Sequence, residues 1–363
     1  SLGATDEIDL TATAVDLNGT LTISGDTTLE DGADLITASA GSNNTRIGVN
    51  AGNSIQSGGD NNVVVGYNAG TAITTGDDNT FLGAASGDAT TTATQNTAAG
   101  SLSLSANTTA SNCTAVGYNA LGSNTTGTPN NAFGAFALDA NTTGSDNVAF
   151  GNNALGVSTT GSSNTAVGVQ SLAANTTASA NTALGYESLT ALTTGNSNVA
   201  IGYRALKTDT LGDRNVAVGN EALSTQNFTS STDSYNVGVG YQAGKSVTTA
   251  IYNTLLGGLT GDAITTGGYN VALGTLALST ETAGQKSVAV GYGALSTQNL
   301  TSATDIYNVA VGHAAGTNLT TGGTNTIVGG LAGNAITTAN HTVAIGFQAG
   351  TAITTGSSNI CIG

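Results

Sequence analysis

The strongest constraint on this chain is a phrase close to Asn-Thr-Ala-Val-Gly, which recurs nineteen times between Gly48 and Gly363. The glycines keep a 17-residue period in fifteen of the eighteen intervals, while one interval is a single position longer and two are four positions longer. A repeat this short cannot bury its apolar side chains alone and must stack on its neighbours. The sequence therefore predicts an all-β fold, a parallel β-solenoid (β-roll) of about 19 rungs over residues 44–363.

The residues around each of these repeat glycines predict one β-strand. The third residue before the glycine is Thr, Val or Ile in eighteen of nineteen repeats, the residue directly before it is always apolar, and Ala usually lies between them. This alternation indicates a strand that is apolar on both faces, and such strands are usually covered on both faces. Thr-Thr pairs such as Thr142 and Thr143 predict a second short strand that closes at a turn.

A further position predicts how the core is filled. The fourth residue after the repeat glycine is only ever Leu or Gly, and seven of the eight Gly repeats carry an aliphatic residue three positions later. We infer that one side chain fills the core from either place, which conserves core volume. Two repeats break the rule: Thr90 predicts a loosely packed layer and Leu192 a crowded one.

Asn precedes the strand in sixteen of nineteen repeats, which predicts a hydrogen-bonded ladder of side-chain amides along the stack. Its representative members are Asn164, Asn181, Asn198 and Asn215. Tyrosines that follow the glycine in adjacent repeats, such as Tyr186 and Tyr203, are expected to stack on each other.

The two longest intervals carry nearly the same insertion, at 225–235 and 297–307. An insertion in a solenoid must bulge outward, so these loops are the candidate receptor contacts. Duplication of a multi-rung block explains them equally well. The candidate contact residues are Asn227, Phe228, Asp233, Tyr235, Asn299, Leu300, Asp305 and Tyr307.

Residues 1–43 lack the repeat and hold eight of the 22 acidic residues with no basic residue. Alternating apolar residues on either side of Asn18-Gly19 predict a small acidic β cap or joint with a hairpin. The chain contains no methionine, even at position 1, so we expect it to be part of a longer protein.

Composition excludes several classes of function. The net charge is −16 and only six residues are Lys or Arg, so neither nucleic acid nor an anionic membrane surface is an expected partner. No apolar run is long enough to insert into a membrane. His313 and His341 occupy different repeat positions, so we expect no catalytic triad, metal site or cofactor, and no enzyme. Cys113 and Cys361 lie about fourteen rungs apart, too far for a disulfide.

The phrases Asn164-Thr-Ala-Val-Gly and Asn198-Val-Ala-Ile-Gly-Tyr-Arg-Ala-Leu resemble the head repeat of trimeric autotransporter adhesins. They are even more similar to the repeats of bacteriophage tail fibres. The resemblance implies a left-handed parallel β-roll assembled as a homotrimer. The chain departs from the adhesins in its longer rung and in the absence of coiled-coil heptads and a C-terminal membrane anchor.

We therefore expect a structural fibre protein: a rigid trimeric shaft, about 90 Å long at roughly 4.8 Å per rung, in the tail fibre of a virion. It would present or form part of a host-attachment device, joined at either end to other fibre or virion proteins, with a host surface glycan or protein as a further candidate partner. The alternative is a bacterial cell-surface adhesin head or an extracellular filament subunit that binds through loops 225–235 and 297–307.

Overall fold

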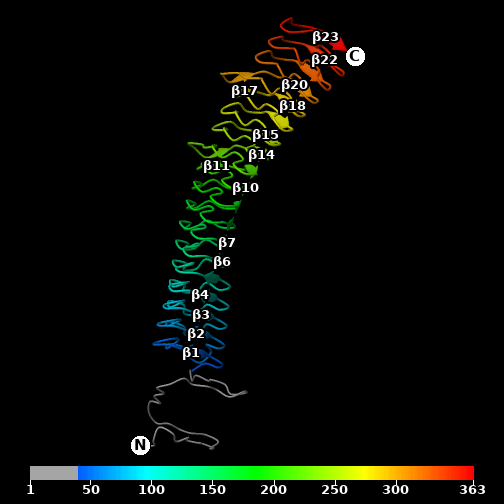
Figure 1. Ribbon diagram of the computed structural model, residues 1–363. Coiled ribbons are helices and arrows are strands. Elements are labelled where there is room, and N and C mark those ends of the chain that lie inside the picture. Colours follow the sequence, from blue (N-terminus) through cyan, green and yellow to red (C-terminus); the bar gives the residue numbers. More distant parts are fainter. Residues whose placement is uncertain (1–39) are drawn as a thin grey trace, which may run out of the picture. The chain divides into compact units, whose positions relative to one another are not determined.

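The computed structural model describes residues 40–363, which form a stack of nineteen turns of a parallel β-solenoid (Figure 1). Each turn contributes one short strand to a single 19-stranded sheet, and the described range contains no helix. The predicted all-β solenoid and its period are confirmed, because equivalent residues of successive repeats pair along the sheet. The predicted cap over 1–43 lies, except for residues 40–43, outside the described residues.

The strands of this sheet pair in parallel, each with the strand of the next turn. In chain order they are β1 (Thr45–Ile47), β2 (Val63–Val65), β3 (Thr80–Leu82), β4 (Thr97–Ala99), β5 (Thr114–Val116), β6 (Asn130–Phe133), β7 (Asn147–Phe150), β8 (Thr165–Val167), β9 (Thr182–Leu184), β10 (Val199–Ile201), β12 (Val216–Val218), β14 (Val237–Val239), β15 (Thr254–Leu256), β16 (Val271–Leu273), β18 (Val288–Val290), β20 (Val309–Val311), β21 (Thr326–Val328), β22 (Val343–Ile345) and β23 (Ile360–Ile362).

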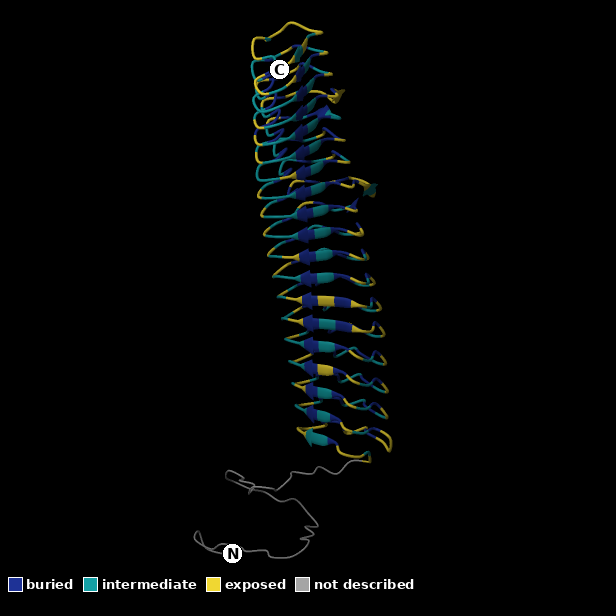
Figure 2. Ribbon diagram, turned by 90° about the vertical axis from the view of Figure 1, so that its right-hand side faces the viewer, coloured by how far each residue is buried: buried dark blue, intermediate teal, exposed yellow. Residues whose placement is uncertain are grey.

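The register places each repeat position over the same position of the next turn. In β8 and β9, for example, Thr165 aligns with Thr182 and Ala166 with Ala183. The middle residue of a strand, usually Ala, faces the interior, and Ala166 is fully buried. Its two neighbours in the strand face outward and remain partly exposed, as Figure 2 shows by alternating colours along the strands.

The Thr-Thr pairs do not form the predicted second strand. At Thr142 and Thr143 the chain bends instead, and Thr142 donates its backbone N–H (2.9 Å) and its hydroxyl (3.0 Å) to the carbonyl oxygen of Thr159. The pair therefore links successive turns by hydrogen bonds while the backbone turns the corner. The prediction was wrong because β-propensity at this position competes with the need to close each short turn of the solenoid.

Within the described range, strands outside the 19-stranded sheet occur only beside the two insertions. There β11 (Gly212–Asp213) pairs with β13 (Thr232–Asp233), and β17 (Gly284–Gln285) pairs with β19 (Thr304–Asp305).

The asparagine ladder is confirmed. Asn181 donates its backbone N–H (3.0 Å) and Nδ2 (3.3 Å) to Oδ1 of Asn164, and Nδ2 also reaches the carbonyl oxygen of Gly195 at 2.9 Å. Its own Oδ1 accepts the N–H of Asn198 at 2.9 Å, and Asn198 supports Asn215 in the same way. All four side chains are fully buried, so the ladder satisfies polar groups that would be costly to leave unpaired.

The choice between Leu and Gly at the fourth position after the repeat glycine has a backbone cause. All ten leucines there have φ between 49° and 54°, in the left-handed region, and the eight glycines have φ between 53° and 69°. Glycine adopts this conformation freely, and leucine adopts it at a cost of about 1–2 kcal/mol. Burial of the leucine side chain offsets that cost by about 2 kcal/mol, whereas a β-branched residue would be strained further.

The core layer at Thr90 is not loose as predicted. Phe81 replaces the usual Ala in the middle of β3 and is fully buried, and its ring carbons lie 2.5–2.7 Å from the position of a Cβ built on Gly87. The side-chain volume that Gly87 and Thr90 do not supply therefore comes from Phe81 in β3, the strand of the same turn. Leu192 is fully buried, and crowding of its layer stays a prediction.

Alanine at Gly257 is expected to lower the free energy of unfolding by about 3 kcal/mol or more. Gly257 has φ +139°, and a Cβ would lie 2.8 Å from the carbonyl oxygen of Gly274 in the next turn. At the adjacent Gly258 nothing lies within 4 Å of an added Cβ, so Gly258→Ala should change stability by less than about 1 kcal/mol. Chemical denaturation of the two variants tests this, and equal midpoints would contradict it.

Isoleucine should be tolerated at Leu192 but not at Leu189. Both leucines are fully buried in one turn, but only Leu189 has a positive φ, of 49°. Leu192→Ile should cost less than about 1.5 kcal/mol, the usual value for an isomeric core substitution, and Leu189→Ile should cost about 1–2 kcal/mol more. Thermal and denaturant unfolding of both variants measure the difference, and a smaller loss at Leu189 than at Leu192 would disprove the backbone argument.

Candidate functional site

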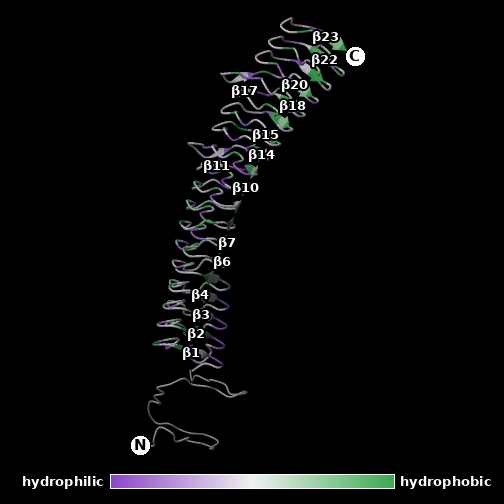
Figure 3. Ribbon diagram, in the orientation of Figure 1, coloured by the Kyte–Doolittle hydropathy of each residue, from purple (hydrophilic) through white to green (hydrophobic). Residues whose placement is uncertain are grey.

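The outward-facing residues of the sheet form an uncharged and largely apolar surface along the stack. This outer face consists of the residues three and one before each repeat glycine, and none of them is charged in any of the nineteen strands. Its larger side chains are well exposed, with Phe150 at 57% and Leu184 at 45%. In Figure 3 the arrows of this sheet near the labels β15, β20, β22 and β23 are drawn largely in the hydrophobic colour. Soluble monomers rarely expose apolar surface of this extent, so the outer face is a candidate interface.

Aromatic side chains that directly follow the repeat glycine stack along the turns. The rings of Tyr186 and Tyr203 lie 5.7 Å apart and nearly parallel, which confirms the predicted stacking. Tyr292 stacks on His313 in the same way at 5.4 Å. These rings stabilise one another and remain partly exposed.

The two insertions leave the stack from the same edge, where β11 and β17 lie (Figures 1 and 2). Each insertion returns as a two-residue strand, β13 or β19, that pairs with the turn before it. Backbone hydrogen bonds therefore hold the base of each loop.

In the first loop most of the predicted contact residues are accessible. Asn227 is exposed and accepts the hydroxyl of Thr210 at 2.8 Å, and Tyr235 is 44% exposed. Asp233 is exposed and forms an ion pair with Arg214. Phe228 is only 5% exposed, so its prediction as a surface contact was wrong: the loop turns this apolar ring inward.

In the second loop the corresponding residues keep these contacts. Asn299 is exposed and accepts the hydroxyl of Thr282 at 2.9 Å, while Leu300 is half-buried. Oδ2 of Asp305 accepts the Lys286 ammonium at 2.5 Å and the Tyr307 hydroxyl at 3.1 Å. The hydrogen bond from Lys286 holds the pKa of the Asp305 carboxyl below its ordinary value. Asp305 is therefore ionised and neutralised by its neighbour.

Two buried carboxylates, which the sequence analysis did not single out, anchor the loops. Glu281 lies in the turn before the second insertion and is fully buried. Its Oε1 accepts the N–H of Gly284 at 2.6 Å and, from the loop, the N–H of Leu300 at 3.1 Å. Its Oε2 accepts Nε2 of Gln298 at 2.9 Å.

Asp209 has the equivalent role beside the first loop. Its Oδ2 accepts Nε2 of Gln226 at 2.6 Å and its Oδ1 accepts the N–H of Gly212 at 3.0 Å. Burial raises the pKa of this carboxyl, and these hydrogen bonds partly oppose the shift. The signal was present in the sequence, because an acid stands at the seventh position after the repeat glycine only in the two turns that precede an insertion.

A single column of residues runs along the edge that carries the loops. This edge column contains the residues five before each repeat glycine, all in the left-handed conformation from Arg214 onward. Its members from there to the second loop and beyond are Arg214, Tyr235, Tyr252, Tyr269, Lys286, Tyr307, Thr324, His341 and Ser358.

At both insertions a basic residue of the edge column lies over the tyrosine that follows it in the column. The column residues of the next two turns then differ between the two insertions. The Arg214 guanidinium lies 5.7 Å from the centre of the Tyr235 ring, and the Lys286 ammonium lies 5.2 Å from that of Tyr307. Beyond the first loop, Tyr252 stacks on Tyr235 at 5.6 Å, and Tyr269 stacks on Tyr252 at 5.0 Å. Beyond the second loop, Thr324 and His341 occupy those two positions.

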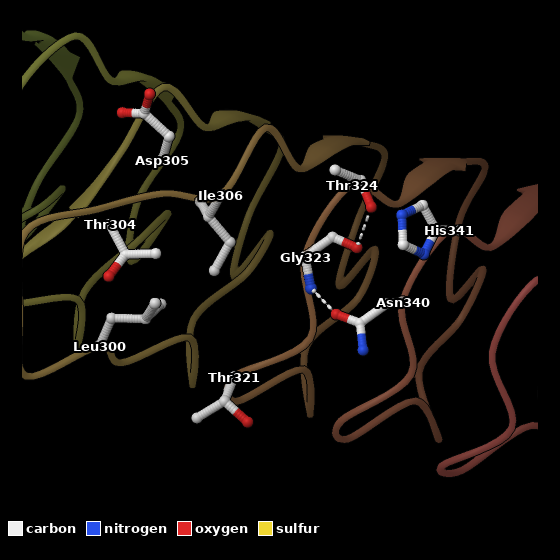
Figure 4. Close-up of a pocket in the computed structure, with 9 residues that line it drawn as sticks. All are labelled: Leu300, Thr304, Asp305, Ile306, Thr321, Gly323, Thr324, Asn340 and His341. Carbon is white, nitrogen blue, oxygen red and sulfur yellow. Dashed lines mark hydrogen bonds between the residues drawn. The ribbon is translucent and has the colours of Figure 1, made fainter.

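A pocket of about 260 Å³ opens at this second loop (Figure 4). The loop forms one wall, and the next two turns form the other. Within it, Oδ1 of Asn340 accepts the N–H of Gly323 at 2.7 Å. The lining residues are Leu300, Thr304, Asp305, Ile306, Thr321, Gly323, Thr324, Asn340 and His341.

Other chemical groups are sparse in the part of the chain that the structure describes. No three His, Cys, Asp or Glu residues there are grouped so that they could hold a metal ion, and no helix there is able to cross a membrane. Cys113 and Cys361 are both free, as their spacing predicted.

A comparison of the chain with protein-family models, curated proteins and solved structures finds no match.

Removal of the Glu281 carboxylate should loosen the second loop. Glu281→Ala leaves several N–H groups without an acceptor, each at a cost of about 1–3 kcal/mol if it stays buried, so amide exchange at 282–284 and 298–306 should accelerate. The control is Glu221→Ala, which removes a surface carboxylate that pairs with Lys245 at 2.8 Å and should cost less than about 1 kcal/mol. Unchanged exchange in Glu281→Ala would refute the anchoring role.

Proposed function

We propose that this chain is a structural fibre protein, a rigid shaft in which three copies pack through their outer faces. In this proposal the shaft belongs to the tail fibre of a virion, is joined to other virion proteins at its ends and serves in host attachment. The resemblance of its repeats to those of phage tail fibres and trimeric adhesins suggests this setting and the number three.

The single observation that carries the proposal is the uncharged outer face. It extends through all nineteen strands while its side chains, such as Phe150 and Leu184, stay substantially exposed. An uncharged, largely apolar face that follows the whole stack can be buried by other copies of the same chain, because every turn presents a similar pattern. Three copies around a common axis would each bury one such face.

The internal bonding supports a mechanical role. Buried asparagines and threonine pairs connect each turn to the next by several hydrogen bonds, as at Asn181 and Thr142. Long-range order of this kind resists bending of one turn against another, as a spacer requires. In the described part of the chain no three His, Cys, Asp or Glu residues are grouped to hold a metal ion, which is compatible with a scaffold.

The oligomeric state tests this proposal. Native mass spectrometry and sedimentation should give three copies for the chain, and Phe150→Glu with Leu184→Glu should shift it to the monomer, because charges buried in an apolar interface cost several kcal/mol. Val157→Glu is the control: Val157 is 45% exposed but lies outside the strands, so this variant should keep three copies. A monomeric unaltered chain would overturn the shaft proposal.

A second candidate function is a bacterial adhesin head or an extracellular filament subunit. The observation that favours it is the pair of protruding loops, whose exposed Asn227 and Asn299 lie on a surface that is otherwise uniform. In this proposal a host glycan or protein binds at the loops. The fibre shaft and the adhesin differ in the segments expected to flank the chain. They also differ in the loops, which only the adhesin needs for attachment.

A further inference from the structure

We propose that the pocket at the second loop binds a neutral hexopyranose, such as one unit of a surface glycan. The inference deepens the proposed attachment role, on which it rests, by naming a site and a ligand class. The two insertions are copies of one block, yet Tyr252 and Tyr269 of the first copy correspond to Thr324 and His341 of the second.

This replacement removes two rings from a stack. In the first copy Tyr252 covers the face of Tyr235 at 5.6 Å, and Arg214 lies over the same ring. In the second copy Lys286 lies over Tyr307, but no ring of the described residues stacks on Tyr307. The Tyr307 side chain is 52% exposed. The pocket of the second copy is lined by Thr324 and His341, which hold the positions of those two tyrosine rings.

The polar groups of the pocket favour a sugar over an aromatic ligand. The hydroxyl of Thr321 and the imidazole of His341 make no hydrogen bond within the described part of the chain, and both line the pocket. Leu300 and the buried Ile306 supply apolar surface beside them. A pyranose has an apolar face for such aliphatic side chains and hydroxyls for such polar groups.

The charge of the site favours a neutral sugar. The carboxylate of Asp305 is the acidic group in the pocket wall, and the ammonium of Lys286 already neutralises it at 2.5 Å. Among the described residues no Lys or Arg lines the pocket, so an acidic sugar would lack a free cationic partner. The volume of about 260 Å³ lies just below the range of sites for drug-sized ligands and suits a single ring.

The test is saturation-transfer NMR and calorimetry of the full chain with methyl glycosides of glucose, galactose and mannose, and with sialic acid as the anionic probe. At least one neutral hexoside should bind with a Kd on the order of millimolar, as expected for one sugar ring. Thr324→Tyr with His341→Tyr should weaken it at least about tenfold, because two tyrosine side chains would occupy the pocket that Thr324 and His341 line.

The chain provides a matched control. Tyr252→Thr with Tyr269→His makes the reverse change in the first copy and should leave the affinity of the second-loop pocket unchanged. It should open no second site, because four further lining positions differ in the first copy: Phe228, Ser234, Ile251 and Gly268 stand where the pocket has Leu300, Ile306, Gly323 and Asn340. The filled variant is expected to fold, because tyrosine already occupies these positions in the first copy with φ of 59° and 60°, against 58° and 56° for Thr324 and His341.

Three results would overturn the proposal: no hexoside binding at tens of millimolar, binding only of sialic acid, or binding that persists in the filled variant. None of them would alter the three-copy mass that tests the shaft. Conversely, a monomeric chain that still binds a hexoside in this pocket would refute the shaft alone.

Discussion

In-phase parallel stacking is the constraint on which the rest of this structure depends. Each residue lies over its own equivalent in the next turn. A side chain that can hydrogen-bond to a copy of itself therefore satisfies the polar groups of every residue at that repeat position. Asn181 illustrates this, since it donates to Asn164 and accepts from Asn198 with the same amide. The repeat glycines depend on the same register, because the carbonyl of one approaches the Cα of the preceding one too closely for any side chain, as Gly257 and Gly274 show.

The core is filled under a second constraint, set by the backbone. The fourth position after the repeat glycine is left-handed in every turn, which restricts it to glycine or to an unbranched-Cβ residue such as leucine. Where glycine is present, volume comes from the aliphatic residue three positions later, from the middle of an adjacent strand, or from both. Phe81 is the extreme case, since one ring supplies the layer that Gly87 and Thr90 leave short.

The surface divides into a uniform part and a local part. The outer face repeats without a charge through all the strands, which suits association with copies of the same chain. The edge with the insertions carries individual features: buried anchors at Asp209 and Glu281, a stack of tyrosines after the first loop and a pocket after the second. A duplicated block could diverge there without disturbing the stack, because the edge side chains are exposed and their replacement leaves no cavity in the core.

The amino-acid sequence by itself determined the solenoid, the strand in each turn and the asparagine ladder, because a strict period forces equivalent residues into columns. It also located both insertions. Only the tertiary structure decided which strand face is inside, that the Thr-Thr pair bends, and that Phe228 is buried. Those outcomes depend on how each short turn closes in space, which periodicity does not specify. The pocket likewise required the fold, since it brings Leu300 of the loop near His341, two turns later.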